Sequence, residues 1–145
     1  MNKILTLFFN LLRLRTFDPK VVRFLWNECD IKIFRYGIGN GAFRNYLLDS
    51  FYPPCIDIGK SISYVEKMTT LLHEVGHYKD YKLIPDKHLE SFFNNDKRCE
   101  KSAWKHAVRF SDKYNIAINN KTSLNSIKSY GCSYRVLEKR AINER

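Results

Sequence analysis

The stretch from residue 63 to residue 85 constrains the fold more than any other part of the chain. Ser63 and Glu66 have the spacing of a capping box, in which the two side chains satisfy free backbone N–H groups at the start of a helix. Apolar residues then recur along one helical stripe, at Val65, Met68, Leu72 and Val75. Pro85, preceded by Ile84, ends the pattern. The sequence therefore predicts a helix that carries residues 73–77 in its interior.

The interior of this predicted helix contains the pattern His-Glu-x-x-His. Because residues four apart lie above one another on a helix, His73 and His77 direct two imidazoles toward one point. Two imidazole nitrogens at this spacing suit a divalent metal ion such as zinc. Glu74 lies about 100° round the helix, where it can flank the metal as a general base without binding it. The pattern predicts a metal-dependent hydrolytic site.

A catalytic zinc ion has three protein ligands, so a third ligand must come from elsewhere in the chain. Glu100 is the main candidate, because it shares one face of a predicted helix over residues 96–114 with Ala103 and Ala107. A carboxylate on such a face is hard to explain as a solvated charge, whereas buried charges are paired or bind metal. The two alanines, and the costly Gly76 inside the first helix, indicate that the two helices pack closely.

Other residues compete for the third ligand position. His88 and Glu90 lie in a predicted connection over residues 83–95. His106 lies about 120° from Glu100 on the same predicted helix, so we expect it to face elsewhere. A further alternative for Glu100 is an ion pair with a neighbouring lysine of its own helix.

The region before the motif predicts a small sheet, and hence an α+β domain. A strand is expected at residues 31–36, followed by a hairpin turn at Asn40 and Gly41. A further short strand is expected at Ile56, Asp57 and Ile58. The two prolines before it lack N–H donors, which favours the edge of the sheet. A helix is expected from Pro19 to about Cys29.

Length and composition fit one domain over residues 19–145, with residues 1–18 as a helical extension. The hydrophobic fraction of 44% is enough for a real core. The N-terminal apolar run is far shorter than the roughly 20 residues that span a bilayer, and no cleavage site follows it. The four cysteines have no C-x-x-C spacing, so we expect reduced thiols. Together these features predict a cytoplasmic protein without a membrane span, with secretion as the alternative.

The formal net charge of +10 favours anionic partners, including nucleic acid. The basic residues are spread over the chain, however, and the densest run follows one solvated side of the helix at residues 96–114. We expect any nucleic-acid contact to be non-specific.

The segments 71–77 and 100–104 resemble those of the gluzincins, which are zinc peptidases with His-Glu-x-x-His on one helix and a glutamate on the next. Within that group the chain is most similar to the compact ImmA/IrrE-type metallopeptidases of bacteria, phages and mobile elements. The resemblance implies a zincin-like α+β domain, with an edge strand packed on the motif helix and a second ligand-bearing helix. It implies one zinc ion bound by His73, His77 and Glu100. It also implies hydrolysis of peptide bonds in a protein substrate, with Glu74 as general base.

The same resemblance implies that the edge at residues 56–58 binds an extended peptide by strand addition. The chain departs from the family pattern at Trp104, which stands where an acidic residue would orient a histidine. Asp57 and Asp80 are alternatives for that role. The residue that stabilises the oxyanion stays open among Tyr130, Tyr134 and His106.

Two rival interpretations remain at this point. The first is a DNA-associated protease of the SprT type, with His88 as third ligand and the positive charge used on DNA. The second is a basic zinc-binding module or effector without catalytic activity. The sequence does not give the oligomeric state.

Overall fold

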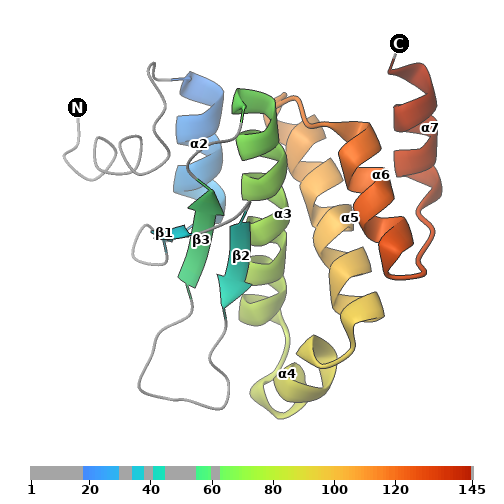
Figure 1. Ribbon diagram of the computed structural model, residues 1–145. Helices are drawn as coiled ribbons and strands as arrows, with labels where there is room; N and C mark the ends of the chain where they lie inside the picture. The colour runs from blue at the N-terminus through green and yellow to red at the C-terminus, as the bar shows by residue number, and fades with distance from the viewer. Residues whose placement is uncertain (1–17, 30–33, 38–40, 45–54, 60–62, 145) are drawn as a thin grey trace.

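Helices form most of the described part of the chain. The computed structural model describes residues 18–29, 34–37, 41–44, 55–59 and 63–144. Its helices are α2 (Pro19–Glu28), α3 (Tyr64–Leu83), α4 (Asp86–Phe93), α5 (Asp96–Tyr114), α6 (Asn120–Ser129) and α7 (Arg135–Asn143). Its strands are β1 (Phe34–Gly37), β2 (Gly41–Arg44) and β3 (Cys55–Gly59). Figure 1 shows α3 and α5 side by side at the centre, with α6 and α7 beyond α5.

Helix α3 is the element around which the others pack. The Ser63 hydroxyl accepts a hydrogen bond from the Glu66 backbone N–H at 3.3 Å, as the capping sequence predicts. The Glu66 carboxylate accepts a second bond from the Asn119 side chain at 2.8 Å, which ties the start of α3 to the segment before α6. Helices α2 and α5 pack on α3 through a shared apolar core. Its fully buried large side chains are Tyr114, Phe24, Met68, Leu71, Leu72, Ile127, Leu137, Val21 and Val75.

The contact between α3 and α5 is unusually close at one point. A Cβ atom added to Gly76 would lie 2.5 Å from the backbone oxygen of Ala103 and 3.1 Å from its Cα. Only a residue without a side chain fits there, because real Cβ atoms do not approach backbone atoms so closely. The prediction that Gly76 marks the close approach of a second helix is confirmed.

Helix α2 is fastened to this pair by one buried carboxylate. Glu28 pairs with Lys79 of α3 at 3.3 Å and with Lys113 of α5 at 3.4 Å, and it accepts a bond from the Tyr114 hydroxyl at 3.2 Å. Burial opposes ionisation, but the two lysines lower the pKa of Glu28 below its usual value. A buried charge with this many partners holds three helices in register.

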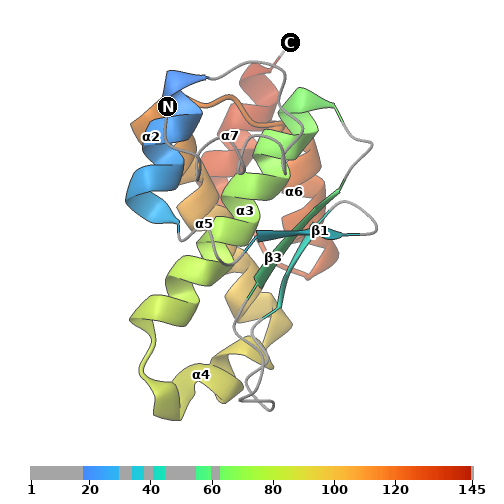
Figure 2. The ribbon, with the colours of Figure 1, turned by 90° about the vertical axis from the view of Figure 1, so that its left-hand side faces the viewer.

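The expected α+β fold class is wrong, and the order of the strands also differs from the expected one. Its strand order is β1-β3-β2, with β3 parallel to β1 and antiparallel to β2. The strand that contains Ile56, Asp57 and Ile58 is therefore central, and the prediction of an edge strand there is wrong. The predicted hairpin is wrong as well, because β3 separates β1 from β2. In Figure 2 this small sheet and α2 lie on opposite sides of α3, and the described fold is predominantly helical rather than a balanced α+β domain.

Residues 83–95, which we expected to be a connection, contain a helix. This helix, α4, buries Leu89 and Phe92. Helix α6 also forms, after an Asn119 cap whose side chain accepts from the Thr122 backbone N–H at 3.0 Å. Tertiary burial of a few apolar side chains stabilises such short helices where propensity alone does not. Of the extension expected at residues 1–18, only Asp18 belongs to the described residues, and the expected turn residue Asn40 lies outside them. Among the helices that are described, none is both long enough and apolar enough to cross a bilayer.

Candidate metal centre

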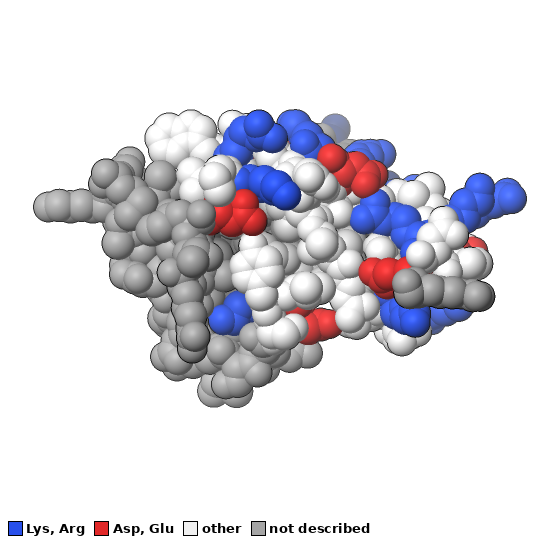
Figure 3. Space-filling model, turned by 90° about the horizontal axis from the view of Figure 1, so that it is seen from above, with Lys and Arg blue, Asp and Glu red and all other residues white. Residues whose placement is uncertain are grey.

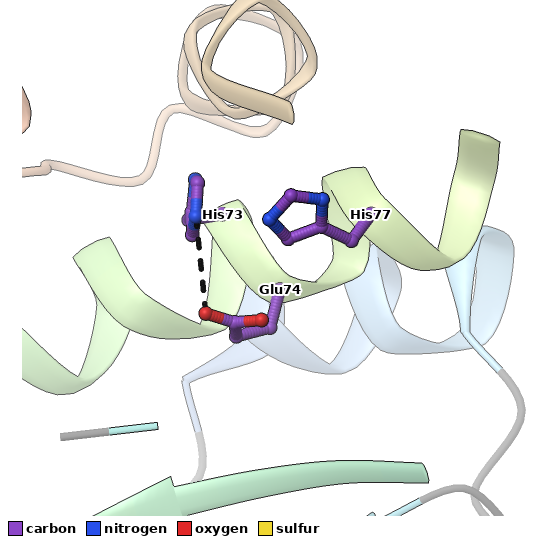
Figure 4. A group of neighbouring side chains, drawn as sticks. All are labelled: His73, Glu74 and His77. Carbon is purple, nitrogen blue, oxygen red and sulfur yellow. Dashed lines mark ion pairs between the residues drawn. The ribbon is translucent and has the colours of Figure 1, made fainter. Parts of the chain in front are cut away.

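Helix α3 presents two histidines and a glutamate as one buried group. His73 and His77 are 8% and 6% exposed, and their ring centroids are 4.6 Å apart. Figure 4 shows both imidazoles on the same side of the helix, with Glu74 on its flank. A Glu74 carboxylate oxygen lies 3.9 Å from His73 Nε2. The one-turn spacing of the motif thus places two nitrogen donors and a carboxylate around one small space.

Glu100 of α5 completes this group. One of its carboxylate oxygens lies 3.0 Å from His73 Nε2 and the other lies 3.2 Å from His77 Nε2. The close approach of α5 at Gly76 brings the carboxylate to the two imidazoles, since Ala103 is one helical turn beyond Glu100. The residue that we ranked first as third ligand is therefore in contact with both histidines.

The electrostatics of the group call for a cation. Burial would raise the pKa of Glu100, but hydrogen bonds from His73 and His77 lower it to about 2. Burial would lower the pKa of His77, but its hydrogen bond to Glu100 and the charges of Glu74, Glu100 and Asp80 raise it above its usual value. A buried carboxylate, Glu74, and a partly buried one, Glu100, are thus held beside two imidazoles. A divalent cation would neutralise both carboxylates and leave the imidazoles neutral.

The potential metal donors form two overlapping sets among the described residues. The ligand atoms of His73, Glu74 and His77 lie within 4.8 Å of one another, and so do those of His77, Cys99 and Glu100. Cys99 is a donor that the sequence reasoning missed. Its one available signal was its position directly before Glu100, which a single thiol in a helix does not make specific. Burial, and then the charge of Glu100, raise the pKa of Cys99 to about 12.

Aromatic side chains fix the orientation of the histidine rings. Trp104 stacks on His73 with ring centroids 4.0 Å apart and an interplanar angle of 28°. The indole N–H is held in turn by the Ser126 hydroxyl at 3.3 Å. His73 Nδ1 is buried and has no hydrogen-bond partner within the described ranges. The stacked indole at position 104 therefore orients this ring, where we looked for an acidic side chain. Phe93 of α4 lies beside His77, with ring centroids 6.3 Å apart.

Asp80 and His106 form a separate buried pair. Their side chains meet at 2.8 Å, between α3 and α5. This contact engages His106 away from the metal donors, as its helical position predicted. Asp57, the other acidic residue considered for orienting a histidine, has no described side chain.

Tyr130 is one of the three candidates for stabilising the oxyanion, and its pKa depends on a residue of the donor group. The charge of Glu100 is the largest cause that raises the pKa of Tyr130 above its usual value, followed by burial. The turn that follows Tyr130 is held against α5 by the Cys132 thiol, which donates to the Lys97 backbone oxygen at 3.1 Å. Tyr134 instead packs under the Lys105 ammonium group, 5.9 Å from its ring centroid.

The remaining predicted site residues lie apart from the donors. His88 and Glu90 are exposed residues of α4, and neither belongs to a donor set of the described chain. A cavity of about 550 Å³ lies near the start of α3 and the end of α5. Its lining includes Tyr64, Ser111 and Arg140 but no residue of the donor sets described above.

Comparisons with family models, with curated proteins and with solved structures give no match to this chain. The assignment of its function therefore rests on the residues of the donor group and on their geometry.

Proposed function

We propose that the chain is a zinc-dependent metallopeptidase in which His73, His77 and Glu100 hold the metal ion. One observation carries the proposal: the Glu100 carboxylate spans the Nε2 atoms of both histidines, at 3.0 and 3.2 Å. Two imidazoles and one carboxylate from two rigid helices are a donor set typical of catalytic zinc. Glu74 is buried beside them, with a carboxylate oxygen 3.9 Å from His73 Nε2, and this position for a general base supports a hydrolytic role.

Zinc, when bound, supplies Lewis acidity that polarises a carbonyl group and lowers the pKa of water. The side chains of the protein do the rest. Glu74 accepts the proton of the attacking water and returns it to the leaving amine. The Tyr130 phenol is protonated near neutral pH, as ordinary phenols are, and its pKa is raised further by Glu100. It can therefore donate a hydrogen bond to the oxyanion. Trp104 keeps the His73 ring from rotating.

The order of the strands indicates where an extended peptide substrate could bind. Because β3 is paired on both sides, an extended peptide cannot add beside residues 56–58. Of the two outer strands, β2 (Gly41–Arg44) is the one that also packs on α3. We therefore place the substrate backbone along β2, where main-chain pairing would hold a peptide over the motif helix. The free thiols of Cys99 and Cys132 support a reducing compartment such as the cytoplasm.

The rival protease in which His88 is the third ligand has less support, because His88 is exposed on α4. The described side chains on one face of the molecule do not favour a nucleic-acid interface either. On the face seen in Figure 3, lysine and arginine side chains alternate with acidic and uncharged ones rather than forming one patch. Several basic groups of α5 are already engaged, since Arg98 lies over the Phe92 ring and Lys113 pairs with Glu28.

The substitution Glu74→Gln tests the proposal. We expect the variant to bind one equivalent of zinc with the affinity of the original protein and to lose peptidase activity on an unfolded protein substrate, because the amide cannot accept the proton. Glu90→Gln, on the exposed face of α4, is the matched control and should keep full activity. A Glu74→Gln variant as active as the control would exclude this mechanism.

A further inference from the structure

Cys99 is a sulfur donor beside the metal centre that the mechanism above does not use. Its ligand atom lies within 4.8 Å of those of His77 and Glu100, and the residue is 5% exposed. The thiol is free and makes a hydrogen bond of 3.5 Å to the Asp96 backbone oxygen. Thiols are weak hydrogen-bond donors, so this contact costs little to break.

The position of Cys99 follows from the same helical geometry that places Glu74. Consecutive residues of a helix lie about 100° apart. Glu74 therefore lies beside His73 and His77 on α3, and Cys99, directly before Glu100 on α5, lies beside His77 and Glu100. The donor group is thus enclosed by one oxygen donor and one sulfur donor in addition to its three central ligands.

We propose that Cys99 is the fourth ligand of a closed resting form of the metal centre, in which its sulfur occupies the coordination position that water needs. This inference rests on the proposed function, because it assumes an ion held by His73, His77 and Glu100. A tetrahedral ion with these three ligands has one position left. Two donors of the described sets remain, Glu74 and Cys99, and Glu74 is the base of the proposed mechanism, which leaves Cys99 for this position. Formation of the sulfur–metal bond would release the thiol proton and the bound water to solvent. When the bond breaks, the thiolate would take up a proton from solvent and a water molecule would take the open position.

The sulfur and nitrogen ligands of the closed form would make it selective among metal ions. Thiolate and imidazole ligands favour thiophilic ions such as zinc and cadmium, whereas magnesium and calcium require oxygen ligands. We therefore expect tight binding of cadmium to the full chain and no competition from magnesium. Cys99→Ser should weaken cadmium binding by at least about 10-fold, the lower bound for losing an outer-shell partner of a metal ligand.

Cobalt(II) substitution gives a direct readout, because a thiolate bound to cobalt produces a charge-transfer absorption in the near ultraviolet. The full chain loaded with one equivalent of cobalt should show this band, and Cys99→Ser and Cys99→Ala should lose it while they still bind cobalt. Cys132→Ser is the matched control, since Cys132 is also buried but bonds to the Lys97 backbone oxygen. X-ray absorption of the zinc-loaded original protein should show one sulfur at about 2.3 Å.

A peptide hydroxamate, which competes for the open position, should weaken the band. Stoichiometric cobalt without a sulfur band in the original protein would overturn the role of Cys99 and leave the three-ligand site intact. A band that survives in both Cys99 variants would also overturn it. Failure to bind any metal would instead refute the proposed function, so the two failures are distinguishable.

Discussion

The donor group shows how single side chains divide the work between binding and orientation. Glu100 contacts both histidines, whereas Trp104 contacts the face of His73. Glu100 and Trp104 are four positions apart in the sequence, so one helical face of α5 supplies both a ligand and the surface that holds another ligand in place. A mutation at Trp104 would therefore act on the metal through His73 and not through a lost bond.

Tyr130 provides the residue-scale prediction. We expect Tyr130→Phe to lower kcat by about 10- to 100-fold with little change in KM or zinc content. A lone oxyanion donor is worth about 10²–10³-fold in kcat, and here the metal shares that charge. The measurement is steady-state kinetics on a quenched peptide, with zinc determined in the same samples. Tyr134→Phe is the control because Tyr134 packs under Lys105. Equal activity of the two zinc-loaded variants would remove Tyr130 from the mechanism.

At the scale of elements, the sequence predicted what depends on local spacing. The helices at 19–28, 64–83 and 96–114 carry their own caps and apolar stripes, and they are confirmed. The order of the strands was not predictable, because the insertion of β3 between β1 and β2 depends on long-range pairing. Cys99 was missed for a related reason: its role depends on α3, a different helix, and nothing in its own neighbourhood indicates a ligand.

The contact between α3 and α5 gives a prediction at this scale, through Gly76→Ala. Alanine favours a helix over glycine by about 1 kcal/mol, but overpacking costs typically 1–3 kcal/mol. Because the added Cβ would meet the Ala103 backbone oxygen at 2.5 Å, we expect a lower free energy of unfolding. The displaced α5 should also carry Glu100 away from the histidines and weaken zinc binding. Chemical denaturation of the metal-free protein and a chelator competition measure the two effects.

Gly131→Ala is the control that separates the loss of stability from the loss of zinc affinity expected for Gly76→Ala. Gly131 has a φ of 73°, which strains a residue with a side chain, yet no atom lies within 4 Å of an added Cβ. This variant should lose stability and keep its zinc affinity. If Gly76→Ala stabilised the protein and bound zinc normally, the helix contact would not be what positions Glu100.

Across the whole molecule, the donor group links stability to pH in opposite ways with and without metal. In the metal-free protein, the pKa of Glu100 falls from 4.5 to about 2, so its contribution to stability is present above pH 4.5 and is lost as the pH falls toward 2. The pKa of His77 is raised above 6.5, so its contribution is present below pH 6.5 and is lost as the pH rises through the raised value. The metal-free protein should be most stable between these limits.

Bound zinc should change the way in which stability depends on pH on the alkaline side. A bound imidazole must be neutral, so metal binding releases the His77 proton and strengthens as the pH rises. We therefore expect the increase in Tm on adding zinc to be larger at about pH 8 than at about pH 6, while the metal-free Tm falls over the same interval. Thermal unfolding with zinc or with a chelator measures both curves, and His88→Ala, an exposed histidine of α4, should leave them unchanged. A zinc-induced shift in Tm that is independent of pH would mean that the ion binds without displacing the His77 proton, and the two-histidine site would have to be abandoned.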